Sequence, residues 1–100
     1  MNKEYEQLSL EFTTKAQTLF ILTFEQLRNS TKTLNRQKDE NVFQLQVGKF
    51  VATLKQQLEN IAIELMKKNS SLKNTSLCNK ILTDHIEAYL NEFRRKSRSV

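Results

Sequence analysis

The feature that most constrains the fold of this chain is its lack of turn residues. The 100 residues include no proline and a single glycine, Gly48. A fold of many strands needs such residues at its turns, whereas long runs of Leu, Glu, Gln and Lys suit helices. We therefore predict an all-α protein, and its length is that of a single domain over residues 1–100. Gly48 falls inside a predicted helix, where it either permits close packing or weakens that helix.

The spacing of apolar residues predicts three helices, at about 3–28, 39–68 and 76–95, with a basic tail at 94–100. The second has the clearest pattern, because steps of four and three alternate as in a coiled coil and keep one seam facing a neighbour. That seam is Val47, Val51, Leu54, Leu58, Ile61 and Leu65. Short connectors then predict an antiparallel up-down-up three-helix bundle with long helices.

Residues suited to capping precede two of these helices. Asp39 is a good N-cap for the second helix, and Asn74, Thr75 or Ser76 can cap the third. These positions support the predicted boundaries.

The chain has few residues for catalysis. His85 is the sole histidine and Cys78 the sole cysteine, and their spacing puts them about 10 Å apart along a helix. That is too far to share a proton or a metal ion. Asp84 and Glu87 fall on the expected solvent face, and one glycine cannot make a phosphate-binding loop. We predict no enzyme activity, no cofactor, no metal site and no small-molecule substrate.

The expected location of the protein follows from three observations. No apolar run approaches the roughly 20 residues that span a bilayer. The opening MNKEYEQ carries two glutamates where a signal peptide has only positive charge, and the lone Cys78 fits a reducing compartment. We expect an intracellular protein, in the cytoplasm or the nucleus, that is neither secreted nor bound to a membrane.

The run Leu19-Phe20-Ile21-Leu22 cannot all be buried. Consecutive helical residues point about 100° apart, so a three-helix bundle leaves some of the four facing outward. Either neighbouring long side chains cover them, or they contact a second copy or another subunit.

The third helix is also too short to cover the whole bundle, which predicts an uncovered end. We expect apolar residues of the first and second helices to contact a partner there. The predicted contact residues are Phe20, Leu22, Phe24, Val42, Phe43 and Leu45.

The same end gathers most of the net charge of +5. The predicted basic pole is Arg28, Lys32, Arg36, Lys38, Arg94, Arg95, Lys96 and Arg98. Eight cations against Glu25, Asp39, Glu40 and Glu92 leave +4 at this pole. The cations can complement a helix dipole and solvate the tail, steer an acidic protein partner, or bind phosphates. No sequence pattern for specific recognition of DNA or RNA accompanies them.

These patterns favour a small non-enzymatic module for protein interaction and assembly. It would form a homo-oligomer or dock on another helical subunit, with the uncovered end as contact and the basic pole as its charged rim. The alternative is a nucleic-acid accessory protein that uses the basic pole for non-specific phosphate contacts.

Overall fold

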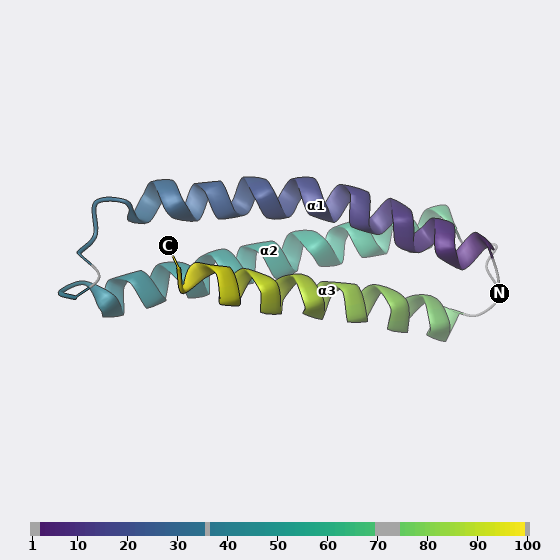
Figure 1. Ribbon diagram of the computed structural model, residues 1–100. Coiled ribbons are helices and arrows are strands. Elements are labelled where there is room, and N and C mark those ends of the chain that lie inside the picture. The colour runs from purple at the N-terminus through teal and green to yellow at the C-terminus, as the bar shows by residue number, and fades with distance from the viewer. Residues whose placement is uncertain (1–2, 36, 70–74, 100) are drawn as a thin grey trace.

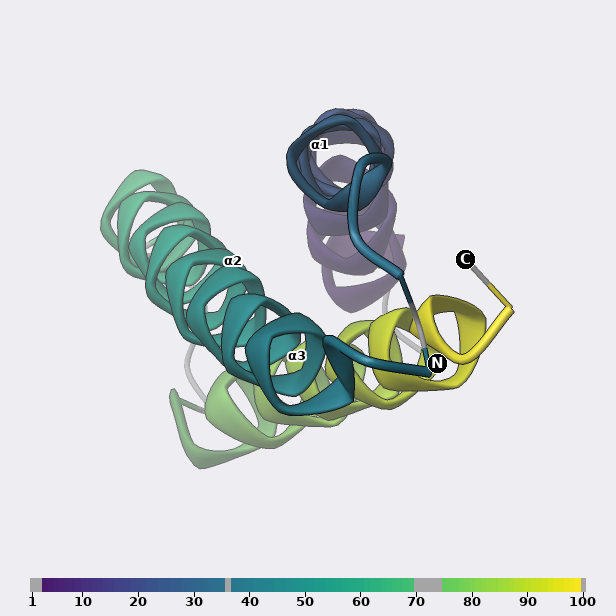
Figure 2. The same ribbon diagram turned by 90° about the vertical axis from the view of Figure 1, so that its left-hand side faces the viewer.

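The computed structural model describes residues 3–35, 37–69 and 75–99. These residues form three helices, α1 (Lys3–Thr31), α2 (Glu40–Lys68) and α3 (Thr75–Ser97). They run up, down and up (Figure 1), which confirms the predicted all-α three-helix bundle. In an end-on view, α1 lies above α2 and α3, which run side by side beneath it (Figure 2).

All three helices contribute to one core cluster, and the predicted seam of α2 lies within it. The buried residues of α2 are Phe43, Val47, Val51, Leu54, Leu58, Ala62 and Leu65. The seam differs from the prediction at Ile61, which is only half-buried, while Ala62 points inward. An α-helix drifts by about 20° per heptad against a strict seven-residue repeat. This drift turns the seam by one position near the end of α2.

The first and third helices continue past their predicted ends. α1 extends through Thr31, whose buried Oγ1 donates a hydrogen bond to the Leu27 carbonyl at 2.7 Å. α3 extends to Ser97, whose Oγ donates to the Arg94 carbonyl at 2.7 Å. Both hydroxyls bond back to backbone carbonyls three or four residues earlier in the same helix, as Ser and Thr side chains commonly do. The polar residues therefore lie within the last turns and do not break the helices.

The predicted capping role of Asp39 was wrong. α2 begins at Glu40, but the carboxylate of Asp39 makes no capping hydrogen bond to it. Its Oδ2 accepts a hydrogen bond from the backbone N–H of Asn35 at 3.0 Å, so it closes the connector. Thr75 is the first residue of α3, and Asn74, another predicted cap, lies outside the described residues.

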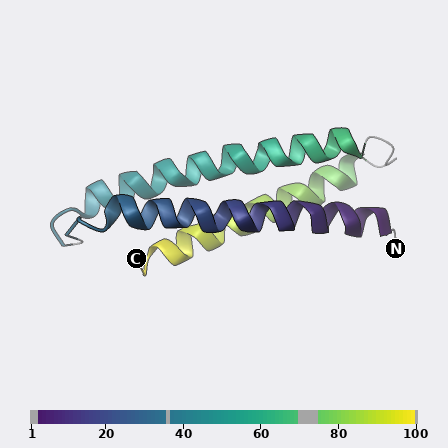
Figure 3. The same cartoon turned by 90° about the horizontal axis from the view of Figure 1, so that it is seen from above.

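α3 is too short to run the full length of the other two helices. It has 23 residues against 29 in each of them, a difference of about 9 Å. α1 and α2 project beyond its C-terminal end (Figure 1), and α3 crosses obliquely under α1 when seen from above (Figure 3). The projecting ends nevertheless bury Leu27 and Phe43, and Leu34 of the connector packs against the core.

Candidate interaction surface

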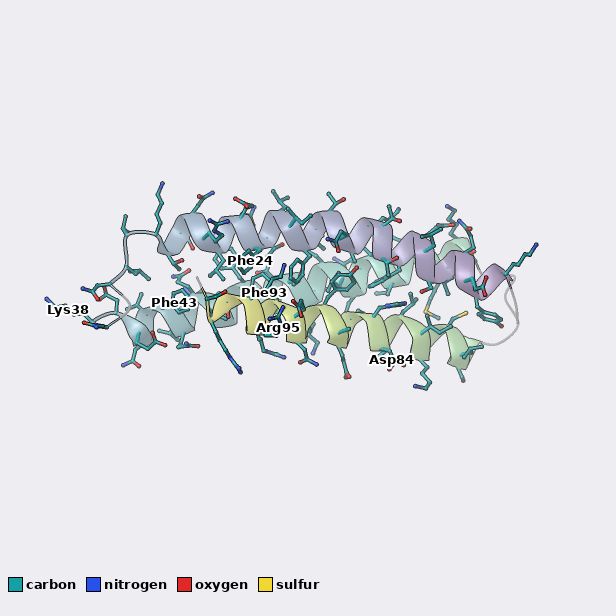
Figure 4. All side chains as sticks on the ribbon, viewed as in Figure 1. Phe24, Lys38, Phe43, Asp84, Phe93 and Arg95 are labelled. Atoms are coloured by element: carbon teal, nitrogen blue, oxygen red, sulfur yellow. The ribbon has the colours of Figure 1, made fainter. Side chains whose placement is uncertain are left out.

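Two of the predicted contact residues belong to the core. Phe20 is 5% exposed and Phe43 is 1% exposed, so the prediction that they contact a partner was wrong. Phe20 is covered because α3 brings Tyr89 and Phe93 against it, with ring centroids at 5.9 and 5.7 Å. Phe43 is covered because the projecting ends of α1 and α2 pack on each other. Phe24 is half-buried and packs edge to face on Phe93 at 5.6 Å (Figure 4).

The other predicted contact residues do not form one surface. Leu22, Val42 and Leu45 are exposed, as predicted. α1 ends at Thr31 and α2 begins at Glu40, at the same end of the bundle (Figure 1). Leu22 lies nine residues before the end of α1 and Val42 is the third residue of α2, so their levels along the bundle differ by about 10 Å. With Phe20 and Phe43 buried as well, the predicted contact residues do not form a single uncovered surface.

The predicted basic pole is also divided. Lys38 lies at the tip of the molecule, whereas Arg95 lies well back along the bundle (Figure 4). Lys32 belongs to the connector at the tip with Lys38, and Arg36 lies outside the described residues. Because α3 stops short of the connector, its cations do not join those of the tip.

Two further cations lie beside carboxylates. Arg28 and Lys96 line a hollow of about 350 Å³ between α1 and α3, together with Glu25 and Glu92. Arg28 lies 3.7 Å from Glu25, and Arg95 Nε donates to Glu92 at 3.0 Å. The hydrogen bond from Arg95 lowers the pKa of the Glu92 carboxyl. Acidic partners therefore offset the positive charge on this side.

The remaining cations of the predicted pole, Arg94 and Arg98, border a long groove between α2 and α3. The groove has two adjoining stretches of about 710 and 550 Å³, which share Lys55 and Arg94. No lining residue belongs to α1. We call this feature the α2–α3 groove; its lining falls within residues 44–66 and 79–98. Apolar lining residues include Ala52, Ala62, Ile63, Met66, Ile86 and Leu90.

Charged side chains are segregated along the α2–α3 groove. Lys55 and Arg94 stand where its two stretches join, and Arg98 lies in the stretch toward the end of α3. Glu59 and Glu87 lie in the other stretch. None of these five side chains forms an ion pair with another described residue. The groove thus has a basic half and an acidic half.

The size of the lining side chains changes along the groove in the same direction. Gly48 and Ala52 line the basic half, and a Cβ placed on Gly48 would meet nothing within 4 Å. Ile63 and Met66 line the acidic half, and Ile63 is 52% exposed. The basic half therefore has small residues at two positions of its lining, and the acidic half has bulky apolar side chains at two positions.

Sequence reasoning missed this groove, although α2 contains a signal for it. Leu45, Ala52, Glu59 and Met66 follow one another at steps of seven, so they lie nearly in line on the helix. This second series was overlooked because the inner seam accounts for the stronger apolar pattern. Gly48 lies on the same side of α2. No other part of the chain packs closely against it.

The catalytic candidates do not assemble into a reactive group. Ser9 Oγ lies 2.6 Å from His85 Nε2, a contact that the sequence did not predict, and His85 stacks on Phe12. No carboxylate of the described residues hydrogen-bonds to the His85 ring. Cys78 is buried, and Asp84 pairs with Lys80 at 3.0 Å. The Ser9–His85 contact therefore joins α1 to α3 without the third group of a catalytic triad.

The described residues also lack two other kinds of feature. They contain no group of three or more His, Cys, Asp or Glu side chains that could hold a metal ion. None of their helices combines the length and the hydropathy of a membrane span. Comparison with protein-family models, curated proteins and solved structures finds no match to this chain.

Proposed function

We propose that this chain is a non-enzymatic assembly module that binds another helical surface through its α2–α3 groove. The groove itself carries the proposal, because Ile63 is half exposed on its apolar floor. None of its five charged side chains forms an ion pair with a described residue. An apolar centre with a polar border is the usual anatomy of a protein interface. A groove between two helices suits a helical partner.

The hollow between α1 and α3 supports this function less well. Its volume is about 350 Å³ against about 710 Å³ for the larger stretch of the α2–α3 groove. Its acidic residues already have partners, because Glu25 pairs with Arg28 and Glu92 with Arg95. A partner that bound there would have to compete with these contacts.

Nucleic-acid binding receives no comparable support. A phosphate backbone is bound by several cations along one surface, and here the predicted pole is divided between the tip, the α1–α3 hollow and the α2–α3 groove. Glu59 and Glu87 also line the α2–α3 groove and would repel phosphates. An intracellular setting, expected from the lone Cys78, remains part of the proposal.

Photocrosslinking in the native cells tests the proposal, because it captures a bound partner of any identity. Benzoylphenylalanine replaces Ile63 in the groove or, as a matched control, Ile21 on α1. The two isoleucines are 52% and 53% exposed, so solvent access does not favour either. We expect discrete crosslinks to protein at position 63, in several-fold higher yield than at position 21. Equal yields, or crosslinks at position 21 alone, would contradict the proposal.

A further inference from the structure

We infer that the occupant of the α2–α3 groove is the same groove of a second copy of this chain, related to the first by a two-fold axis. The inference rests on the proposed function and identifies its partner. In this dimer, α2 packs against α2 of the second copy and α3 against its α3. All four helices are then antiparallel to their neighbours, as in a four-helix bundle.

The charges of the groove are arranged for such a rotation. Across a two-fold axis, if residue i contacts residue j, then j also contacts i. Lys55 and Glu59 are centred on position 57 of α2, and Glu87 and Arg94 are centred between positions 90 and 91 of α3. Lys55 and Arg94 each line both stretches of the groove, so both centres fall near the point where the two stretches join. One axis can therefore pair all four charges with opposite charges.

The side-chain sizes give the same centre independently of the charges. Gly48 and Met66 are centred on position 57, and Ala52 and Ile63 are centred between positions 57 and 58. The rotation that pairs Lys55 with Glu59 therefore brings the bulky Met66 and Ile63 over the small residues of the second copy. At these positions small residues of each groove face bulky residues of the other, which suits the close packing of protein interfaces.

The face is large enough for a stable dimer. α3, which limits its length, has 23 residues, or about 34 Å at 1.5 Å per residue. The bundle is about 20 Å wide. A face of these dimensions covers about 700 Å² on each copy, or about 1,400 Å² in total, within the range of specific interfaces.

Two charge variants of the full chain test this arrangement. Glu59→Lys with Glu87→Lys makes every charge in the groove positive, and Lys55→Glu with Arg94→Glu makes four of the five negative. Sedimentation equilibrium should show a wild-type dimer, and each variant alone should dimerise at least about 100-fold more weakly because like charges meet. An equimolar mixture of the two variants should regain dimers, since every pair is again opposite in sign. Both variants should remain helical, which circular dichroism checks.

The outcomes separate this inference from the proposed function. A wild-type chain that stays monomeric at about 1 mM overturns the second copy as partner, and crosslinks from position 63 to a different protein would then still support the proposed function. Wild-type dimers that both variants retain, or a variant mixture that stays monomeric, overturn the two-fold arrangement. The arrangement is supported only if each variant by itself dimerises weakly and the mixture of the two regains dimers.

Discussion

Phe20 of α1 and Phe93 of α3 meet edge to face, with ring centroids 5.7 Å apart and ring planes at 84°. Aromatic rings prefer this geometry because the positive edge of one meets the negative face of the other. Phe93 contacts Phe24 in the same way and is fully buried. The contacts fix the C-terminal half of α3, which carries Arg94 and leads directly to Arg98 along the α2–α3 groove.

Phe93→Ala should therefore be among the most destabilising substitutions in the chain. Loss of a fully buried phenylalanine and the cavity that it leaves cost about 3–5 kcal/mol. Urea unfolding followed by circular dichroism measures the change in free energy. Phe24→Ala is the control and should cost less, because Phe24 is only half-buried. Equal losses for the two variants would show that Phe93 does not have this role.

Ser9→Ala should remove one polar link between α1 and α3. The hydrogen bond between Ser9 and His85 spans 76 residues of sequence, and such a bond contributes about 0.5–1.5 kcal/mol. The free energy of unfolding should fall by that amount. Thr18→Ala should change it by less than about 0.5 kcal/mol, because Thr18 is exposed and its hydroxyl bonds only within α1. If Ser9→Ala left the free energy of unfolding unchanged, the Ser9–His85 contact would not stabilise the fold.

Two substitutions of Gly48 separate the stability of the monomer from the strength of the dimer. Alanine favours a helix interior over glycine by about 1 kcal/mol, and a Cβ at this position meets no other group. Gly48→Ala should thus stabilise the monomer, measured in the Glu59→Lys, Glu87→Lys background. Gly48→Leu should place a bulky side chain against Met66 of the second copy and raise the dimer dissociation constant at least about tenfold. Dimerisation that Gly48→Leu leaves unchanged would place Gly48 outside the interface.

Glu92 should titrate below the ordinary range of a glutamate, because the hydrogen bond from Arg95 lowers the pKa of its carboxyl. A group with a lowered pKa in the folded state stabilises the fold above its ordinary pKa, and that contribution is lost as the pH falls through the lowered value. NMR titration of the carboxyl carbon measures this pKa directly. In Arg95→Ala the pKa should rise toward the ordinary value. A pKa that is the same in both chains would show that Arg95 is not its cause.

The helices could be predicted from sequence because period and composition are local properties of the chain. The inner seam from Val47 to Leu65 identified α2 and its core face, apart from Ile61. Phe43 shows where this reasoning stops, because its burial depends on how α1, α2 and the connector close beyond α3. No periodicity within one helix carries that information.

The candidate interaction surface could be predicted only in part for a related reason. The exposure of Leu22, Val42 and Leu45 follows from their positions outside the seams. Predicting the shared surface and the single basic pole required the relative positions of residues of different helices along the bundle axis. An error of a few residues in that register moves a side chain by a full turn, or about 5 Å. Arg94 and Arg98 were therefore assigned to the wrong neighbours.

Disulfide formation at the proposed two-fold axis tests the central claim most directly. Asn91 and Asn79 are both exposed and line the α2–α3 groove, so each is changed to cysteine in a Cys78→Ala chain. Asn91 lies at the proposed axis, whereas Asn79 lies about 18 Å from it along α3. Under mild oxidation, Asn91→Cys should form a covalent dimer at least about tenfold faster than Asn79→Cys. Equal rates, or faster dimerisation of Asn79→Cys, would contradict the two-fold assembly through the α2–α3 groove.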